Sequence, residues 1–278
     1  WTPRLDRAAT IGDIDRALAA GMTVSIPGGP VWPDAFADLG AHAPVMLWLR
    51  GDPALLVAPG LSVVGARAAT GYGTNITAEI VDGVCRSGAT IVSGAAYGID
   101  AVAHRTALAA ESPTIAVLAG GLERLYPAGH IELFEQIRAS GLILSEASPA
   151  QVPTRHRFEQ RGRILTALTA GTVIVEAGVR SRTLQLADES EALRRPIGAV
   201  PGPDESPASA GCGRLLTERG ATPIASASDI RQMIAPSGNR PAALSRAERS
   251  TSRRNPLPSM DKIGRPQPGD NPTPGITR

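Results

Sequence analysis

Lysine is almost absent from this chain of 278 residues: of its 28 lysine and arginine residues, only Lys262 is a lysine. Nearly every positive charge is therefore an arginine, whose planar guanidinium suits bidentate contacts with phosphate. Arginine-rich codon usage in a GC-rich genome explains the same bias equally well. The formal net charge is only +2, and eight basic against three acidic residues fall within 235–278. The rest of the chain is net acidic, so any polyanion site there must be a local patch.

Aromatic residues, cysteines and long apolar runs are also scarce. Three residues each of Phe, Tyr and Trp are too few for a broad stacking platform. Cys85 and Cys212 form no CxxC pair and no disulfide framework, which is typical of a cytoplasmic protein. No apolar run approaches the roughly 18 residues of a membrane span, so we expect no membrane partner. Because the chain begins at Trp1, without an initiator methionine, we interpret it as a piece of a longer protein.

Motifs for nucleotide cofactors and metals are missing as well. No GxGxxG fingerprint or Walker lysine motif follows the first main apolar run, so a dinucleotide or triphosphate site is poorly supported. The histidines show no metal-ligand spacing with each other or with cysteine; they are His42, His104, His130 and His156. We therefore expect neither a cofactor nor a metal.

Apolar runs nevertheless recur along the chain, with helical patterns between them. These runs lack strict alternation, as expected for strands that are covered on both faces. Repetition of strand and helix predicts an α/β fold with an extended Rossmann-like, doubly wound, mostly parallel sheet. The runs cover residues 61–64, 90–92, 114–118, 142–144, 172–175 and 197–200.

The two ends of the chain differ from this central part. Residues 1–60 hold strand-like runs at 23–26 and 45–49, and we interpret them as a lead-in that extends the sheet. Residues 61–234 are predicted to form the Rossmann-like domain. The segment 235–278 is polar and contains eight prolines, so it cannot bury enough apolar area to offset its ordering entropy. We predict a disordered basic tail there.

Glycine-rich loops follow several of the predicted strands, beginning at Gly65, Ser93, Ala119 and Glu176. In open parallel sheets, ligands bind beyond the carboxyl ends of the strands. Glycine lets the backbone approach an anion, and the N-terminus of a helix supplies free N–H groups. For a single loop, a tight turn between strand and helix is the favoured interpretation. Several such loops together favour a phosphate-lined edge.

Pairs of polar side chains give a weaker indication of chemistry. Asp100 and His104 lie four residues apart on one predicted helix, a spacing that fits acid–base work or a helix cap with its neighbour. Glu146 and Glu176 each follow an apolar run, where carboxylates do hydrolytic chemistry or anchor loop amides. Because no nucleophile stands beside them, we expect no enzyme.

The densest basic stretch runs from Arg155 to Arg163. On a regular helix, Arg161 and Arg163 lie about 200° apart and cannot share a groove. If the helix starts near Gly162, with Arg161 in the preceding loop, both can contact one ligand. A solvated helix face is the favoured interpretation of this segment alone.

Taken in order, the loop sequences resemble the DprA/Smf family, especially its actinobacterial members. The resemblance spans about residues 30–234 and implies a cytosolic Rossmann-like protein that binds single-stranded DNA and is not an enzyme. It further implies loading of a RecA-type recombinase in natural transformation, and a homodimer. The motifs that carry it are GAR, SGAAYGIDAVAH, LAGGLERLYP, SEASP, RFEQRGRILTALT, VIVEAGVRS, AVPGP and SAGCGRLL.

The resemblance also implies a set of DNA-binding residues. Arg67, Arg161 and Arg163 match the arginines of the family motifs that contact phosphate. The loop residues that match the lining of the same groove are Gly65, Ser93, Gly94, Gly98, Gly120, Gly121 and Ser181.

Five positions around the proposed groove depart from the family pattern, namely Glu159, Gly162, Arg182, Gln185 and Leu186. Gly162 stands in place of an asparagine and Arg182 in place of a glycine. We therefore expect weaker DNA binding than is usual in the family, and tighter binding after Gly162→Asn together with Arg182→Gly. The family's N-terminal helical domain and C-terminal winged-helix module are both expected to be absent from this chain.

Two alternatives stay open. Rossmann-like proteins of the lysine-decarboxylase-like group hydrolyse nucleotide–sugar bonds and carry a PGGxGT motif. Here Pro27-Gly28-Gly29 is followed by Pro30 and precedes the first main strand, which counts against that enzyme. The other alternative is a diverged paralogue that has lost DNA binding.

Truncation after Ile234 tests the interpretation of the basic tail. Because the tail adds charge but no fold, we expect the shortened protein to keep its melting temperature. It should bind single-stranded oligonucleotides less tightly at low salt, since fewer cations meet the phosphates. Thermal denaturation and gel shifts at two salt concentrations measure both effects. A cooperative drop of several degrees in melting temperature would contradict the prediction.

Overall fold

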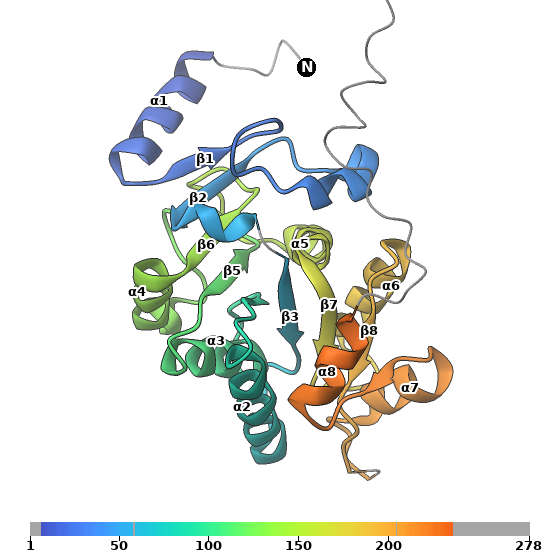
Figure 1. Cartoon of the computed structure of the whole chain (residues 1–278). Helices are drawn as coiled ribbons and strands as arrows, with labels where there is room; N and C mark the ends of the chain where they lie inside the picture. The colour runs from blue at the N-terminus through green and yellow to red at the C-terminus, as the bar shows by residue number, and fades with distance from the viewer. Residues whose placement is uncertain (1–6, 58, 204, 236–278) are drawn as a thin grey trace, which may run out of the picture. The chain divides into compact units, whose positions relative to one another are not determined.

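A computed structural model describes residues 7–57, 59–203 and 205–235 (Figure 1). Its strands form one sheet, in the order β1-β2-β6-β5-β4-β3-β7-β8-β9. The strands are β1 Thr23–Ser25, β2 Leu47–Gly51, β3 Gly60–Val64, β4 Ile91–Ser93, β5 Thr114–Leu118, β6 Leu142–Ser145, β7 Thr169–Ile174, β8 Ile197–Ala199 and β9 Thr222–Pro223. Strands β3 to β9 pair in parallel, whereas β1 and β2 pair antiparallel. The predicted Rossmann-like, mostly parallel sheet is confirmed.

Helices connect the parallel strands and cover both faces of the sheet. The α-helices are α1 Arg7–Ala19, α2 Gly71–Cys85, α3 Ile99–Ala109, α4 Ile131–Ser140, α5 Arg155–Ala167, α6 Gln185–Ala192, α7 Ala210–Glu218 and α8 Ala227–Ile234. Short 3-10 helices are η2 Asp34–His42, η3 Pro53–Leu56, η4 Ala128–His130 and η5 Arg182–Leu184. Helices α2, α3, α4 and α8 pack on one face, and α5, α6 and α7 pack on the other (Figure 1).

Alternate residues of each strand enter different parts of the core. Along β3, Val64 packs with the cluster under α5, whereas Leu61 and Val63 pack with the cluster under α2 and α3. All three side chains are buried. Burial on both faces explains why the apolar runs show no polar alternation.

The N-terminal segment adds two strands to the edge of the sheet, because β2 pairs with β6 and β1 pairs with β2. Helix η2, which comes between β1 and β2 in the chain, packs against α5; its Phe36 is fully buried, and its Asp38 forms an ion pair of 2.8 Å with Arg195. A domain boundary at residue 60 stays a prediction. The predicted tail falls almost entirely on residues 236–278, which lie outside the described residues.

Two helix glycines make a matched test of the packing between α2 and α8. A Cβ at Gly83 would lie 2.6 Å from the Cβ of Ala227 on α8, whereas a Cβ at Gly213 on α7 meets nothing. Alanine gains about 1 kcal/mol of helix propensity over glycine at either site. We expect Gly213→Ala to stabilise the protein, and Gly83→Ala to destabilise it by about 1–3 kcal/mol because of overpacking. Urea denaturation measures both, and equal stabilisation would disprove close packing at Gly83.

Candidate anion-binding site

The candidate site lies where the strand order reverses. The chain continues from β3 to β4 on one side, whereas β7 pairs with β3 on the other, and ligands bind at such switch points in open sheets. A pocket of about 380 Å³ opens beyond the carboxyl ends of β3 and β7. Its walls come from the loop after β3, from the middle of α5 and from η5 with α6. The pocket therefore occupies the edge that the glycine-rich loops predicted.

Three arginines give the pocket its positive charge, and they are Arg67, Arg161 and Arg182. Arg67 and Arg182 are exposed, and neither side chain forms a hydrogen bond or ion pair within the described part of the chain. The guanidinium groups of Arg67 and Arg161 both lie over the Phe158 ring, with Cζ 5.3 Å and 5.6 Å from its centroid. Cation–π attraction at these distances helps to hold two like charges beside one cavity.

Arg161 forms the floor of the pocket. Its Nη1 donates to the carbonyl oxygens of Gly94 at 2.9 Å and Val117 at 3.4 Å, while Nε is buried without a hydrogen-bond partner among the described residues. A Cβ at position 94 would overlap the guanidinium, so this loop requires glycine. Burial lowers the pKa of Arg161, and the nearby Asp100 carboxyl opposes that shift.

Asp100 and His104 perform structural roles at this edge. Asp100 is buried at the first turn of α3 and accepts a hydrogen bond from the Ala96 amide at 3.3 Å. Burial raises the pKa of Asp100, and Arg161 opposes that shift. The buried His104 has Nδ1 2.8 Å from the Thr114 hydroxyl, and burial lowers its pKa to about 3, so the ring is neutral. Asp100 therefore anchors the loop before α3 and does not cap this helix, because the N-cap of α3 is Gly98 and no side chain caps it.

Glu176 occupies the N-terminus of α2, where a phosphate was expected. Its carboxylate is fully buried and accepts from the Thr70 amide at 3.0 Å and the Thr70 hydroxyl at 2.5 Å. A Cβ at Gly73 would overlap this carboxylate, so the glycine at the start of α2 makes room for the protein's own anion. Glu146 has a different partner, Arg163, so the two glutamates do not form a hydrolytic pair.

The predicted loop residues fall into three groups. Gly65 and Ser181 line the pocket with Arg67 and Arg161. Gly94, Gly120 and Gly121 line a small adjoining hollow, in which the Gly121 amide already donates to Gln151 at 2.7 Å. Ser93 and Gly98 line neither.

Ser93 and Gly98 instead shape the loop after β4. The Ser93 hydroxyl is buried and donates to the Val63 carbonyl at 2.7 Å. Gly98 has a φ of 76° and precedes α3, and a Cβ there would overlap the Ala66 carbonyl. Both residues therefore have packing roles that explain their identity without a ligand.

Arg163 and Arg161 do not share a groove, so the expectation that both contact one ligand is wrong. Helix α5 begins at Arg155 and is capped by Thr154, so it does not start near Gly162. Arg163 donates to the Glu146 carboxylate at 2.7 Å and to the His42 carbonyl at 2.7 Å. Its charge is already neutralised by Glu146, and it lines none of the three pockets at this edge.

The five positions that were expected to depart from the family pattern all line the main pocket: Glu159, Gly162, Arg182, Gln185 and Leu186. Arg182 does not have a positive φ, so its backbone does not require glycine. Gly162 faces Glu189, and a Cβ there would overlap the Glu189 carboxylate. An asparagine at 162 would have to displace the Glu189 carboxylate, and the expected gain in binding from that change stays a prediction.

Glu189 was missed by the sequence analysis. It lies on α6 and lines the pocket, and burial raises its pKa to about 7 even though Arg161 and Arg163 lower it. In the sequence it belongs to the acidic run 188–191, which resembles a solvated helix face. The unusual glycine at 162 was the available signal that another side chain fills this space.

Replacement of Arg163 distinguishes a structural ion pair from a ligand contact. Arg163→Ala removes a bidentate pair in which the two side chains are only 19% and 29% exposed. We expect it to lower the free energy of unfolding by about 1–3 kcal/mol. Arg155→Ala is the matched control, because Arg155 pairs with Glu159 at the surface and should cost less than about 1 kcal/mol. If urea denaturation shows equal stability for both variants, the Arg163 pair has no structural role.

Comparisons with known proteins agree with this architecture. A family model described as DNA recombination-mediator protein A matches residues 23–235. The chain is 42% identical over 243 residues to the DNA processing protein DprA of Mycobacterium tuberculosis, covering 83% of this chain and 61% of that protein. It is 33% identical over 202 residues to DprA of Bacillus subtilis, covering 72% and 66%. The chain thus spans about three fifths of the mycobacterial relative.

Solved structures show the same fold. The X-ray structure of DprA from Streptococcus pneumoniae matches with a TM-score of 0.76 and 30% identity, covering 82% of this chain and 78% of that one. DprA from Helicobacter pylori matches with a TM-score of 0.68 and 27% identity, covering 76% and 94%, and its structure is described as giving insight into single-stranded DNA binding. Within the described residues, no helix is long and apolar enough to span a membrane, and no group of three potential metal ligands is present.

Proposed function

The chain belongs to the DNA recombination-mediator protein A (DprA/Smf) family, and from this premise we propose that it binds single-stranded DNA at the pocket beyond β3 and β7. The observation that carries the proposal is the arrangement of three arginines around one cavity. Arg161 is partly buried in its lining, and Arg67 and Arg182 are exposed and form no hydrogen bond or ion pair within the described chain. Guanidinium groups in this arrangement are suited to phosphate oxygens.

A second hollow extends the site along the same edge. It has a volume of about 280 Å³ beyond β5 and β6, and Arg157 and Arg161 both line it. Arg157 is held by the Val152 carbonyl at 2.8 Å and the Gln151 side chain at 2.7 Å. Because Arg161 borders both cavities, a single strand that crosses this edge would meet cations in succession. Such contacts recognise the backbone and not the base sequence.

The wider role is proposed on the family relationship. The family model is named for recombination mediation, and the Helicobacter pylori relative is described as binding single-stranded DNA. We propose that this protein acts in the cytoplasm as a non-enzymatic homodimer that binds single strands and assists loading of a RecA-type recombinase during DNA processing.

The hydrolase alternative gains nothing from the fold. Gly28 and Gly29 follow β1, at the outer edge of the sheet. Strands β2, β6, β5 and β4 separate β1 from β3, so this segment does not border the arginine pocket. Within the pocket, Asp100 and Glu159 are already occupied by an amide and by Arg155.

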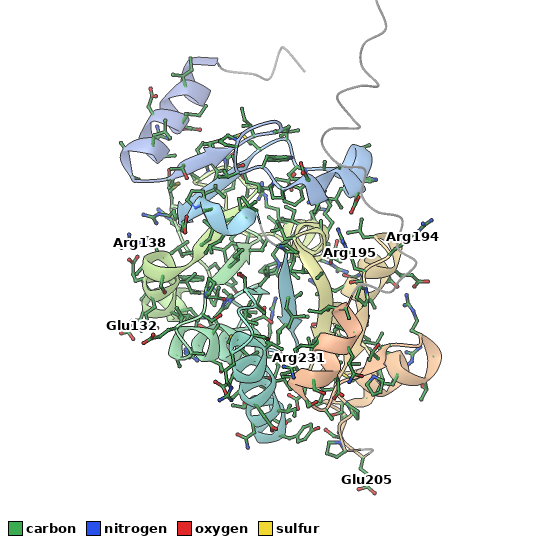
Figure 2. All side chains as sticks on the ribbon, in the orientation of Figure 1. Glu132, Arg138, Arg194, Arg195, Glu205 and Arg231 are labelled. Carbon is green, nitrogen blue, oxygen red and sulfur yellow. The ribbon has the colours of Figure 1, made fainter. Side chains whose placement is uncertain are left out.

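The dependence of DNA affinity on salt tests the proposed function. We expect Arg67→Ala to weaken binding to all single-stranded sequences alike and to reduce the slope of log K against log salt by about 0.7, because one phosphate contact is lost. Fluorescence anisotropy with labelled oligonucleotides measures the slope. Arg138→Ala is the matched control, since it removes the same charge from the outer side of α4 (Figure 2). An unchanged slope in Arg67→Ala would refute the assignment of this pocket.

A further inference from the structure

An acidic side chain lies inside the pocket that is proposed to bind an anion. Glu189 lines the pocket together with Arg161, and its Oε2 is buried without a hydrogen-bond partner among the described residues. A buried carboxylate oxygen without a donor is costly, because it loses its water and gains no replacement. Stability therefore does not explain the position of this carboxylate, which suggests a role in binding a ligand.

Gly162 allows the carboxylate to occupy this place. Gly162 is buried in α5, and a Cβ there would overlap both the carboxyl carbon and the oxygens of Glu189. The Glu189 carboxylate consequently fills the space beside α5 that any other residue at 162 would take. This places it on the same side of α5 as the pocket lining formed by Phe158 and Arg161.

The groups that face Glu189 come from two helices. Arg161 and Arg163 of α5 attract its charge and the Thr166 hydroxyl also favours the ionised form, whereas Asp188 on α6 repels it. Burial outweighs the attraction and raises the pKa of Glu189 to about 7. Since the pKa is raised above the ordinary range, the group is neutral below about pH 7 and negative above it.

The arginines and carboxyl groups that line the pocket are equal in number, so protonation of Glu189 makes its net charge positive. Its arginines face three carboxyl groups, those of Asp100, Glu159 and Glu189. Glu159 already pairs with Arg155 at 3.1 Å, and Asp100 accepts from the Ala96 amide. Glu189 has a buried oxygen that lacks a hydrogen bond among the described residues, and its charge acts on Arg161.

We propose that the Glu189 carboxylate competes with a DNA phosphate for Arg161, so that the pocket binds single-stranded DNA more tightly when Glu189 is protonated. This inference rests on the proposed function of the pocket. The phosphodiester stays fully ionised near neutral pH, so the charge that changes belongs to the protein. Loss of one negative charge leaves the arginines in excess and removes a like charge from the path of the phosphate.

The test compares oligonucleotide affinity at about pH 6 and about pH 8, on either side of the Glu189 pKa of about 7. For the unaltered protein we expect binding to be tighter at the lower pH by about two- to fivefold, the effect of one partly exposed charge pair. Glu189→Gln keeps the shape and removes the charge. It should bind equally at both pH values, as tightly as the unaltered protein does at pH 6.

Glu191→Gln is the matched control. It removes the same charge from the same helix, but Glu191 is 74% exposed and pairs with Arg219 at 2.6 Å on the outer side of α6. This variant should retain the pH dependence of the unaltered protein. The two variants differ only in which carboxylate of α6 is removed, so the comparison between them isolates Glu189. If Glu189→Gln and Glu191→Gln share one pH profile and one set of affinities, the competition does not exist.

A second measurement separates this inference from the proposed function. If no variant binds DNA at either pH, the proposed function fails. Sulfate then tests the pocket alone, because it remains divalent throughout this pH range. A larger sulfate-induced rise in melting temperature for Glu189→Gln than for the unaltered protein at pH 8 supports the competition. Equal rises in both proteins overturn it.

Discussion

The hydrogen bonds from Arg161 to the carbonyl oxygens of Gly94 and Val117 determine the shape of the site. A guanidinium can lie there only because position 94 has no side chain, and its charge is not cancelled because carbonyl oxygens carry only partial charge. The guanidinium groups of Arg161 and Arg67 both lie over the Phe158 ring. The cation at the centre of this edge is thus one partly buried arginine, which α5 directs toward the loops that follow β4 and β5.

The N-termini of the helices at this edge are largely satisfied by the protein itself. Glu176 caps α2 through Thr70, and Asp100 accepts an amide at the start of α3. Anions are stabilised at helix N-termini whether they come from a ligand or from the chain. The glycines of these loops therefore allow close packing, and the attraction for an external phosphate must come from arginine side chains.

The sheet could be predicted from sequence because its strands are buried on both faces and appear as apolar runs. The start of α5 could not, since residues 155–163 are nearly all polar, although Thr154 offered a capping signal. The sequence therefore predicted that Arg161 and Arg163 both bind DNA, whereas in the structure Arg163 forms an ion pair with Glu146. The sequence also could not distinguish the roles of the glutamates in the acidic run 188–191 on α6. Glu191 pairs with Arg219 at the surface and Glu189 turns into the pocket, a difference that only the packing of α6 against α5 creates.

Gly162 and Glu189 must be understood as a pair. Taken alone, a glycine at 162 loses a polar side chain and loosens a helix, which argues for a weakened binding site. In the folded protein this glycine is the space into which a carboxylate fits, beside the cation that a phosphate needs. A side chain at 162 would clash with the Glu189 carboxylate, whereas a smaller residue at 189 would leave a gap beside Arg161. Gly162 and Glu189 together thus place an ionisable group beside Arg161, and under the competition that we propose the charge of the pocket depends on a single proton.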